Sequence, residues 1–151
     1  MKYMLDTNTC IYVIKHKPDT VIRKFLSHDP EELCISAITY AELMHGVEKS
    51  MAVERNRIAM SLFLSPITIL QFDERAAEEY GRIKAELEKK GTPIGPMDTL
   101  IASHAKSRGI IIVTNNTREY NRVVGLTVED WTQGHCHVEK EFKGKHRADK
   151  K

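Results

Sequence analysis

The sequence predicts a single α/β domain in which a central, mostly parallel sheet is covered by helices on both faces. Short apolar runs, which are typical of buried strands, alternate along the chain with longer segments of helical periodicity. The 151 residues suffice for one domain of common size and contain neither an internal repeat nor a linker. We therefore expect a single-domain, three-layer α/β/α fold.

The first strand and the first two helices are defined by their start and stop residues. Residues 2–5 are apolar enough for a short buried strand, and Asp6 directly after them can cap a helix that continues through Ile14. A second helix is expected to begin at Pro18-Asp19, because the apolar residues after it have helical spacing. Asp29-Pro30 ends that helix.

The next strand and two helices follow the same rules. Residues 33–35 predict a second buried strand, and Ser36 can cap the helix after it. Glu42 is expected to lie off the apolar stripe of this helix, which comprises Ile38, Ala41, Met44 and Val47. Residues 52–64 predict another amphipathic helix, with an apolar side that comprises Ile58, Leu62 and Phe63.

A third strand and the longest helix come next. Pro66 stops the preceding helix, and the β-branched run 67–70 predicts a strand. Asp73 can cap a long helix that has one apolar side and one side rich in Lys and Glu. Gly91 is expected to close this helix just beyond its last turn.

The last elements follow a Gly- and Pro-rich turn. Residues 97–108 predict a helix that Gly109 ends, and residues 110–113 have the strongest strand pattern in the chain. Residues 126–128 predict a short last strand. Trp131 is expected to pack near the end of the fold.

Charge divides the chain into a body and a tail. The net charge is +2, but residues 135–151 hold six Lys or Arg against three acids, and this excess leaves the remainder near −1. The tail also loses apolar periodicity. We expect a domain at residues 1–133, followed by a basic, disordered C-terminal extension at residues 134–151.

Cysteine content and hydropathy indicate a cytoplasmic protein with no membrane partner. The three cysteines, an odd number without paired spacing, favour a reducing compartment over a disulfide framework. No stretch approaches the length needed to cross a bilayer, and the first residues reach an acid too soon for a signal peptide.

Three carboxylates stand at element junctions. Asp6 ends the first apolar run, Glu42 lies in the helix after the second strand, and Asp98 follows Gly95-Pro96 in the first turn of its helix. A parallel sheet gathers its strand ends at one edge, so these acids can converge there. Clustered carboxylates repel one another unless they share protons or bind a cation. Each acid also has a simpler interpretation as a helix cap or a solvated charge.

A fourth polar segment follows the strongest strand. Thr114, Asn116 and Glu119 place oxygen atoms directly after residues 110–113, although a cap and a turn would need the same residue types. Oxygen ligands without His or Cys suit Mg²⁺, or Mn²⁺ as the alternative, better than zinc.

Two histidine features carry less weight. His135-Cys136-His137 lies in the polar tail without a fourth ligand nearby, so we interpret it as an incidental cluster. His104 has apolar neighbours on its helix and is expected to be packed or half-exposed rather than catalytic.

Four ordered motifs resemble those of the PIN-domain ribonucleases and, more narrowly, of the VapC toxins of bacterial type II toxin–antitoxin pairs. The resemblance extends from Met1 to about Trp131. The motifs are Met4-Leu5-Asp6-Thr7-Asn8, Ile35-Ser36 through Ala41-Glu42-Leu43, Pro93-Ile94-Gly95-Pro96-Met97-Asp98, and Thr114-Asn115-Asn116-Thr117-Arg118-Glu119-Tyr120.

This resemblance implies an Mg²⁺-dependent endoribonuclease that cuts structured RNA, often a tRNA. Metal-bound water would attack a phosphodiester and leave a 5′-phosphate and a 3′-hydroxyl. A VapB antitoxin would silence the enzyme by laying a C-terminal segment in a groove, with a basic side chain near the acids. The resemblance also suggests a homodimer that assembles further with the antitoxin.

The resemblance assigns roles by position. Asp6 and Asp98 would hold the metal most directly, while Glu42 would bind it through water or orient the nucleophile. The strand-end motif of Thr114, Asn116 and Glu119 would complete the site, with Asn8 as a polar support. Many family members have Asp at the position of Asn116, so this chain carries less negative charge where a second metal would bind.

Two other functions are open to these residues. An aspartate-nucleophile phosphatase needs a second acid two residues after the first, and Asn8 cannot serve as that proton donor. A non-catalytic PIN-like module that only binds an antitoxin or RNA would use its acids as caps and surface charges. Metal-dependent cleavage separates this module from a nuclease.

Overall fold

A five-stranded parallel sheet forms the centre of the protein. The computed structural model describes residues 1–133, and its strands lie in the order β3-β2-β1-β4-β5, with every neighbouring pair parallel. The strands are β1 (Tyr3–Leu5), β2 (Leu33–Ser36), β3 (Thr68–Leu70), β4 (Ile111–Val113) and β5 (Val128–Glu129). The predicted α/β class and parallel sheet are confirmed.

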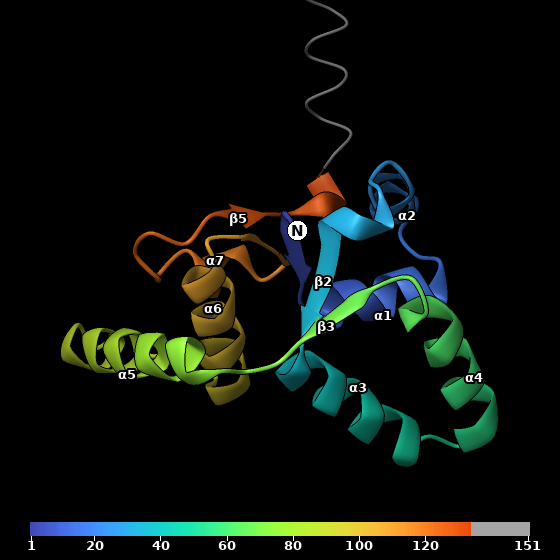
Figure 1. Cartoon of the computed structure of the whole chain (residues 1–151), viewed down its shortest axis with the longest axis horizontal. Helices are drawn as coiled ribbons and strands as arrows, with labels where there is room; N and C mark the ends of the chain where they lie inside the picture. The colour runs from blue at the N-terminus through green and yellow to red at the C-terminus, as the bar shows by residue number, and fades with distance from the viewer. Residues whose placement is uncertain (134–151) are drawn as a thin grey trace, which may run out of the picture.

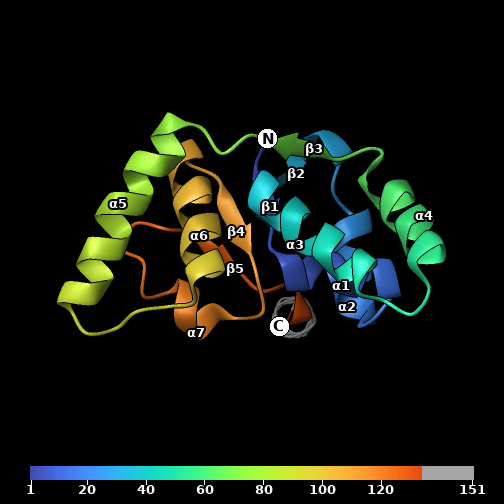
Figure 2. The ribbon, with the colours of Figure 1, turned by 90° about the horizontal axis from the view of Figure 1, so that it is seen from below.

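Helices cover both faces of this sheet, as Figure 2 shows: α5 and α6 lie on one side, and α1, α2 and α4 on the other. One layer consists of α1 (Thr7–Lys15), α2 (Asp19–Leu26), α3 (Ala37–Glu48) and α4 (Val53–Leu64). The other consists of α5 (Glu74–Lys89), α6 (Pro96–Arg108) and the short α7 (Thr117–Tyr120). Two 3₁₀ turns, η1 (Pro30–Glu32) and η2 (Trp131–Gln133), complete the described residues.

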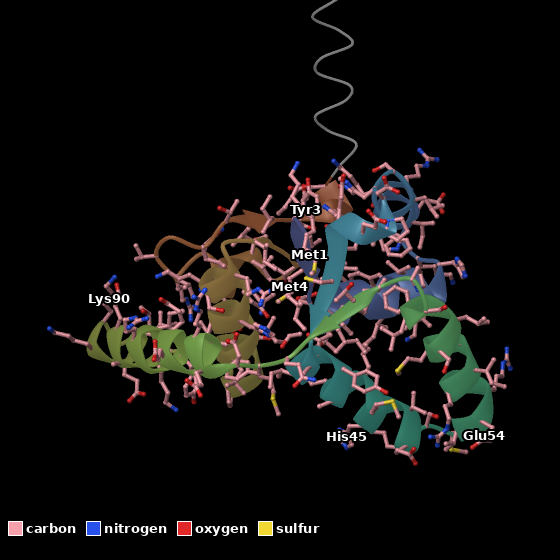
Figure 3. All side chains as sticks on the ribbon, viewed as in Figure 1. Met1, Tyr3, Met4, His45, Glu54 and Lys90 are labelled. Carbon is pink, nitrogen blue, oxygen red and sulfur yellow. The ribbon has the colours of Figure 1, made fainter. Side chains whose placement is uncertain are left out.

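Alternation along the strands divides the core between the two helical layers. On β1, Tyr3 and Leu5 belong to the cluster that packs against α1–α4, whereas Met4 belongs to the cluster under α5 and α6. Figure 3 shows Tyr3 and Met4 near the middle of the molecule, while Lys90 lies at the tip of α5. Because both faces of the sheet are covered, its strands are apolar at almost every position.

The strands are added to one side of β1 first and to its other side afterwards, so the strand order reverses between β1 and β4. The chain moves from β1 to β2 and β3 at one edge (Figure 1), and then returns to place β4 on the other side of β1, as labelled in Figure 2. Leu5 pairs with Val113, and the backbone N–H of Asp6 donates to the Val113 carbonyl at 3.0 Å. Ligands of open α/β sheets bind at the carboxyl ends of strands at such a reversal.

Side-chain caps fix the starts of three helices as predicted. The Asp6 carboxylate accepts from the Thr9 N–H at 2.8 Å, and the Ser36 hydroxyl accepts from the Ile38 N–H at 3.1 Å. Asp73 caps α5 in the same way. The first two caps set the direction in which α1 and α3 leave the carboxyl ends of β1 and β2.

The apolar stripes predicted for α3 and α4 were right only in part. On α3, Val47 is buried, Ile38 and Met44 are partly buried against the core, and Ala41 is exposed. On α4, Ile58 and Leu62 are exposed by 60% and 72%, while Met60 and Phe63 face inward. The contacts of these two helices with α1 and with each other decide which side is buried. The spacing of apolar residues within one helix does not reveal those contacts.

The described chain ends with a packed aromatic residue. Trp131 is 1% exposed, lies edge-on to Tyr3 with ring centroids 5.7 Å apart and stacks on His28 at 5.3 Å. The prediction that Trp131 packs near the end of the fold is confirmed. The predicted extension at residues 134–151 lies outside the described residues, and within residues 1–133 no helix is long and apolar enough to span a bilayer.

Candidate active site

Asp6 lies at the centre of the carboxyl edge of the sheet. Its side chain is 4% exposed, caps α1 and forms side-chain hydrogen bonds with Thr9 and Thr114. Thr9 also donates from Oγ1 to the Val113 carbonyl at 3.1 Å, which fixes α1 to the end of β4. A carboxylate in this position is held in place but poorly solvated.

Glu42 reaches the site from the neighbouring helix. It is half-buried on the second turn of α3, and its Oε1 accepts from the hydroxyl of Thr7 at 2.6 Å. Thr7 follows Asp6 directly, so this bond links α3 to the start of α1. The prediction that Glu42 lies off the buried side of its helix agrees with this position between α1 and α3.

Asp98 stands in the first turn of α6, where the positive end of the helix dipole favours a carboxylate. Its Oδ1 accepts from the hydroxyl of Tyr120 at 3.1 Å. Its Oδ2 accepts from the amide nitrogen of Asn116 at 3.4 Å. The Thr99 hydroxyl donates to the Gly95 carbonyl at 2.8 Å and stabilises the turn that leads into the helix.

Asn116 lies between two of the acids. Its amide nitrogen donates to Glu119 Oε2 at 2.9 Å as well as to Asp98 Oδ2. Two carboxylates as partners require two N–H donors, so the amide NH₂ faces the acids. In this arrangement Asn116 bridges Asp98 and Glu119 as a neutral donor. The Asn116 backbone N–H donates to the Thr114 hydroxyl, which anchors the segment to the end of β4.

The acids influence each other's protonation. Burial raises the pKa of Asp6 above its ordinary value, and the charge of Glu42 adds to this effect. Burial, followed by a hydrogen bond with Glu119, raises the pKa of Asp98 to about 6, and the charges of Glu119 and Asp6 contribute. Burial and the charges of Asp6 and Asp98 raise the pKa of Tyr120, so its hydroxyl remains a donor. One region of the molecule therefore contains all four carboxylates.

The chemistry of these side chains fits a hard divalent cation. All the candidate ligands are oxygen atoms, and burial makes Asp6 and Asp98 costly to ionise, a cost that a bound cation would offset. Among residues 1–133, however, no group of three or more His, Cys, Asp or Glu side chains is already arranged closely enough to hold a metal ion. The acids are neighbours, and binding would have to draw them closer together.

Most of the predicted site residues meet here. The structure brings together Asp6, Glu42, Asp98, Thr114, Asn116 and Glu119. Asn8 is exposed on the first turn of α1, away from these contacts. His135-Cys136-His137 lies outside the described residues. His104 is fully buried, as expected of a packed residue, and its Nδ1 lies 2.7 Å from the Ser36 hydroxyl.

The sequence patterns did not identify two residues that bind the acids of the site. Thr7 binds Glu42, and Tyr120 binds Asp98, yet neither was a candidate. Thr7 belongs to a helix-capping motif, and its hydroxyl was interpreted only as part of that motif. Tyr120 was the last residue of a recognised polar motif, and a phenol so close to a strand end was the available signal.

Comparison with known proteins identifies the family. Residues 3–126 match the model of the PIN domain. The chain is 50% identical over 131 residues to the tRNA(fMet)-specific endonuclease VapC of Salmonella typhimurium, covering 87% of this chain and 98% of that protein. The chain is a VapC protein of the PIN-domain family. It is also 51% identical over 132 residues to the tRNA(fMet)-specific endonuclease VapC of Shigella flexneri, covering 87% of this chain and 99% of that protein.

Solved structures of VapC proteins share the fold. DNA-bound VapBC from Salmonella typhimurium superposes with a TM-score of 0.82 at 50% identity, covering 87% of this chain and 98% of that chain. VapBC2 from Rickettsia felis, bound to a promoter DNA fragment, gives 0.81 at 41% identity, with 87% and 99% covered. The VapC assignment agrees with the four motifs, and PIN-domain nucleases are in general dependent on divalent metals.

The pKa shift of Asp98 predicts how pH affects stability and metal binding. Its folded-state pKa of about 6 exceeds the ordinary 3.8, so the metal-free fold gains stability from protonated Asp98 at low pH and loses it as pH rises through about 6. A divalent cation bound by the Asp98 carboxylate would have to displace this proton. We expect Mg²⁺ to raise the melting temperature clearly at about pH 7.5 and hardly at all at about pH 5.

Differential scanning fluorimetry with Mg²⁺ or with EDTA at both pH values measures this difference. The D98N variant, which lacks both the titrating proton and a proposed ligand, should show little Mg²⁺ effect at either pH. A cation effect of equal size at both pH values would contradict the prediction.

Proposed function

We propose that this VapC protein is an Mg²⁺-dependent endoribonuclease toxin of the cytoplasm that cleaves a structured RNA, with initiator tRNA as the first substrate to test. The observation that carries this proposal is the meeting of four carboxylates at the reversal point of the sheet, where no basic side chain of residues 1–133 takes part in their hydrogen bonds. The names of the Salmonella and Shigella relatives support tRNA as the substrate class.

Each residue has a proposed role. Asp6 and Asp98 would hold the metal most directly, with Glu42 acting through water or orienting the nucleophile. Glu119 would complete the acidic set and Asn116 would lie beside it, while the hydrogen bond from Thr114 would keep the Asp6 carboxylate in place. Mg²⁺ bound there would polarise a phosphoryl oxygen and make water a better nucleophile.

Cleavage of defined RNAs tests the proposal. Purified protein is incubated with initiator tRNA or with an elongator tRNA, in Mg²⁺, in Mn²⁺ or in EDTA, and the product ends are mapped. We expect metal-dependent cuts with 5′-phosphate ends, mainly in the initiator tRNA. Binding of RNA without cleavage in any metal would favour a non-catalytic module.

A groove next to the acids supports an antitoxin as the partner. It encloses about 330 Å³ between α1, α3 and α4, and Glu42 and Lys15 are among its lining residues. The rest of the wall is largely apolar and includes Ile11, Ile14 and Leu43. An amphipathic segment with a basic residue fits such a groove, because its apolar side chains can be buried while its charge meets the acids. We propose that a VapB antitoxin inserts its C-terminal segment there, within an assembly of toxin dimers.

Gly46 allows this groove to be tested without disturbing the core. It lines the groove, and a Cβ added there meets no atom within 4 Å. We expect Gly46→Gln to lower the affinity for the antitoxin by about tenfold or more, since the new side chain occupies the groove, and to leave RNA cleavage by the free toxin unchanged. Isothermal titration calorimetry measures the affinity.

Gly81→Gln is the matched control. Gly81 lies on α5, away from the groove, and its added Cβ also meets nothing within 4 Å. Gln is a better helix former than Gly, so both variants should be slightly stabilised. If the two variants bind the antitoxin equally well, the segment does not occupy this groove.

A further inference from the structure

Tyr120 is a buried phenol at the boundary between the core and the acids. The residue is 0% exposed and belongs to the apolar cluster under α5 and α6, together with Ile101, Ile112 and Val123. Packing on this scale fixes the ring, and therefore the position of its hydroxyl. That hydroxyl donates to Asp98 Oδ1 at 3.1 Å.

The two oxygen atoms of Asp98 have separate donors. Tyr120 binds Oδ1, and the amide of Asn116 binds Oδ2 at the longer distance of 3.4 Å. A carboxylate oxygen has two lone-pair directions, so a hydrogen bond at each oxygen still leaves one direction open for a cation. The Tyr120 bond is the shorter, and it comes from the more rigid side chain.

Asp98 needs such a hydrogen bond because its surroundings oppose the ionised form of its carboxylate. Glu119 lies beside it and is held in the same network by Asn116, and two neighbouring carboxylates repel each other once both are ionised. Asp98 also lies on a helix of one layer, whereas Asp6 leaves the central strand towards the other layer. A donor that fixes Asp98 determines the position of its oxygen atoms before the cation binds.

We propose that Tyr120 is a positioning residue, whose hydroxyl holds the Asp98 carboxylate in the orientation that binds the divalent cation. The inference rests on the proposed metal-dependent nuclease function. Tyr120 does not touch the cation or the RNA in this role. Its effect is transmitted through one hydrogen bond to Asp98.

Tyr120→Phe removes the hydroxyl and keeps the packed ring. We expect the Mg²⁺ concentration for half-maximal binding to rise about tenfold, because a hydrogen bond to a charged group is lost. At saturating Mg²⁺ the kcat should stay within about threefold of the unaltered protein, since the ligands themselves remain. Isothermal titration calorimetry with Mg²⁺ and without RNA measures the first quantity, and single-turnover cleavage measures the second.

Tyr12→Phe is the matched control. Tyr12 is half-buried on α1, and its hydroxyl accepts from the Asn115 amide at 2.8 Å, with no carboxylate involved. The same change there should leave the Mg²⁺ midpoint unaltered. An unaltered midpoint in the Tyr120 variant, or an equal shift in both variants, overturns the proposal.

A double-mutant cycle separates direct coupling from a general loss of stability. In the metal-free protein, Tyr120→Phe should lower the melting temperature when Asp98 is present and have no such effect in the D98A background. Equal losses in both backgrounds overturn the proposal even if the single variant folds poorly. If D98N abolishes Mg²⁺ binding while Tyr120→Phe leaves it intact, the nuclease function stands and only this inference fails. If the unaltered protein binds no Mg²⁺, both fail.

Discussion

Asp6→Asn is expected to lower RNA cleavage by about a thousandfold or more, which corresponds to about 4 kcal/mol of lost transition-state stabilisation. Asp6 is the most central of the acids: it ends the middle strand, and its charge influences the pKa of both Asp98 and Tyr120. Asn has nearly the same shape but no charge, so it cannot replace the carboxylate as a ligand. Single-turnover cleavage of the RNA substrate, compared with the unaltered protein, measures the loss.

The same variant should be more stable than the unaltered protein when no metal is present. Burial raises the pKa of Asp6, so ionisation of this carboxylate destabilises the fold, and Asn cannot ionise. Asn is also as good a helix cap as Asp, so the bond to the Thr9 N–H can be kept. A higher melting temperature in EDTA, together with lost cleavage and intact antitoxin binding, is the expected combination. Cleavage retained within tenfold would remove Asp6 from the proposed metal site.

Trp131→Ala is expected to destabilise the protein by about 3–5 kcal/mol, the usual cost of deleting a large buried aromatic side chain. Trp131 is 1% exposed and packs against Tyr3 of the central strand and against His28. Its indole N–H donates to Glu129 Oε1 at 2.9 Å, so the substitution also removes a partner of β5. Urea unfolding followed by circular dichroism measures the change.

Deleting residues 134–151 is the matched comparison for this prediction. We propose that the folded domain ends at residue 133, and such a deletion should change the free energy of unfolding by less than about 0.5 kcal/mol. Trp131→Phe should fall between the two, because it keeps an aromatic ring of smaller volume. A deletion as damaging as Trp131→Ala would move the domain boundary into the tail.

The sequence predicted the parts of the structure that depend on local patterns. The strand at residues 2–5 and the cap at Asp6 follow from neighbouring residues, and the structure has both at the expected places. The meeting of Asp6 with Asp98 followed from a general property of parallel sheets and from the family motifs. The apolar sides of α3 and α4 were predicted only in part: Val47 and Phe63 are buried, whereas Ile58 and Leu62 are exposed.

The sequence patterns did not predict contacts between residues that are far apart in the chain. The position of Tyr120 near a strand end indicates a polar role, but it does not reveal that the hydroxyl meets a carboxylate 22 residues away. The bond between Thr7 and Glu42, 35 residues apart, is similarly invisible until α3 is placed beside α1. The amide of Asn116 was expected to offer its oxygen to a metal, whereas the two acids around it favour the nitrogen. Side-chain direction depends on which partners the fold supplies.

The pairing of the first strand with the fourth has a consequence for synthesis. Tyr3 leaves the ribosome early, but its partner Ile111 is added more than a hundred residues later. At roughly 5–20 residues per second, the nascent chain therefore waits on the order of 5–20 s before β1 can be enclosed on both sides. Because Glu119 is translated later still, a nascent chain that ends before this residue lacks part of the acidic set and cannot form the proposed metal site.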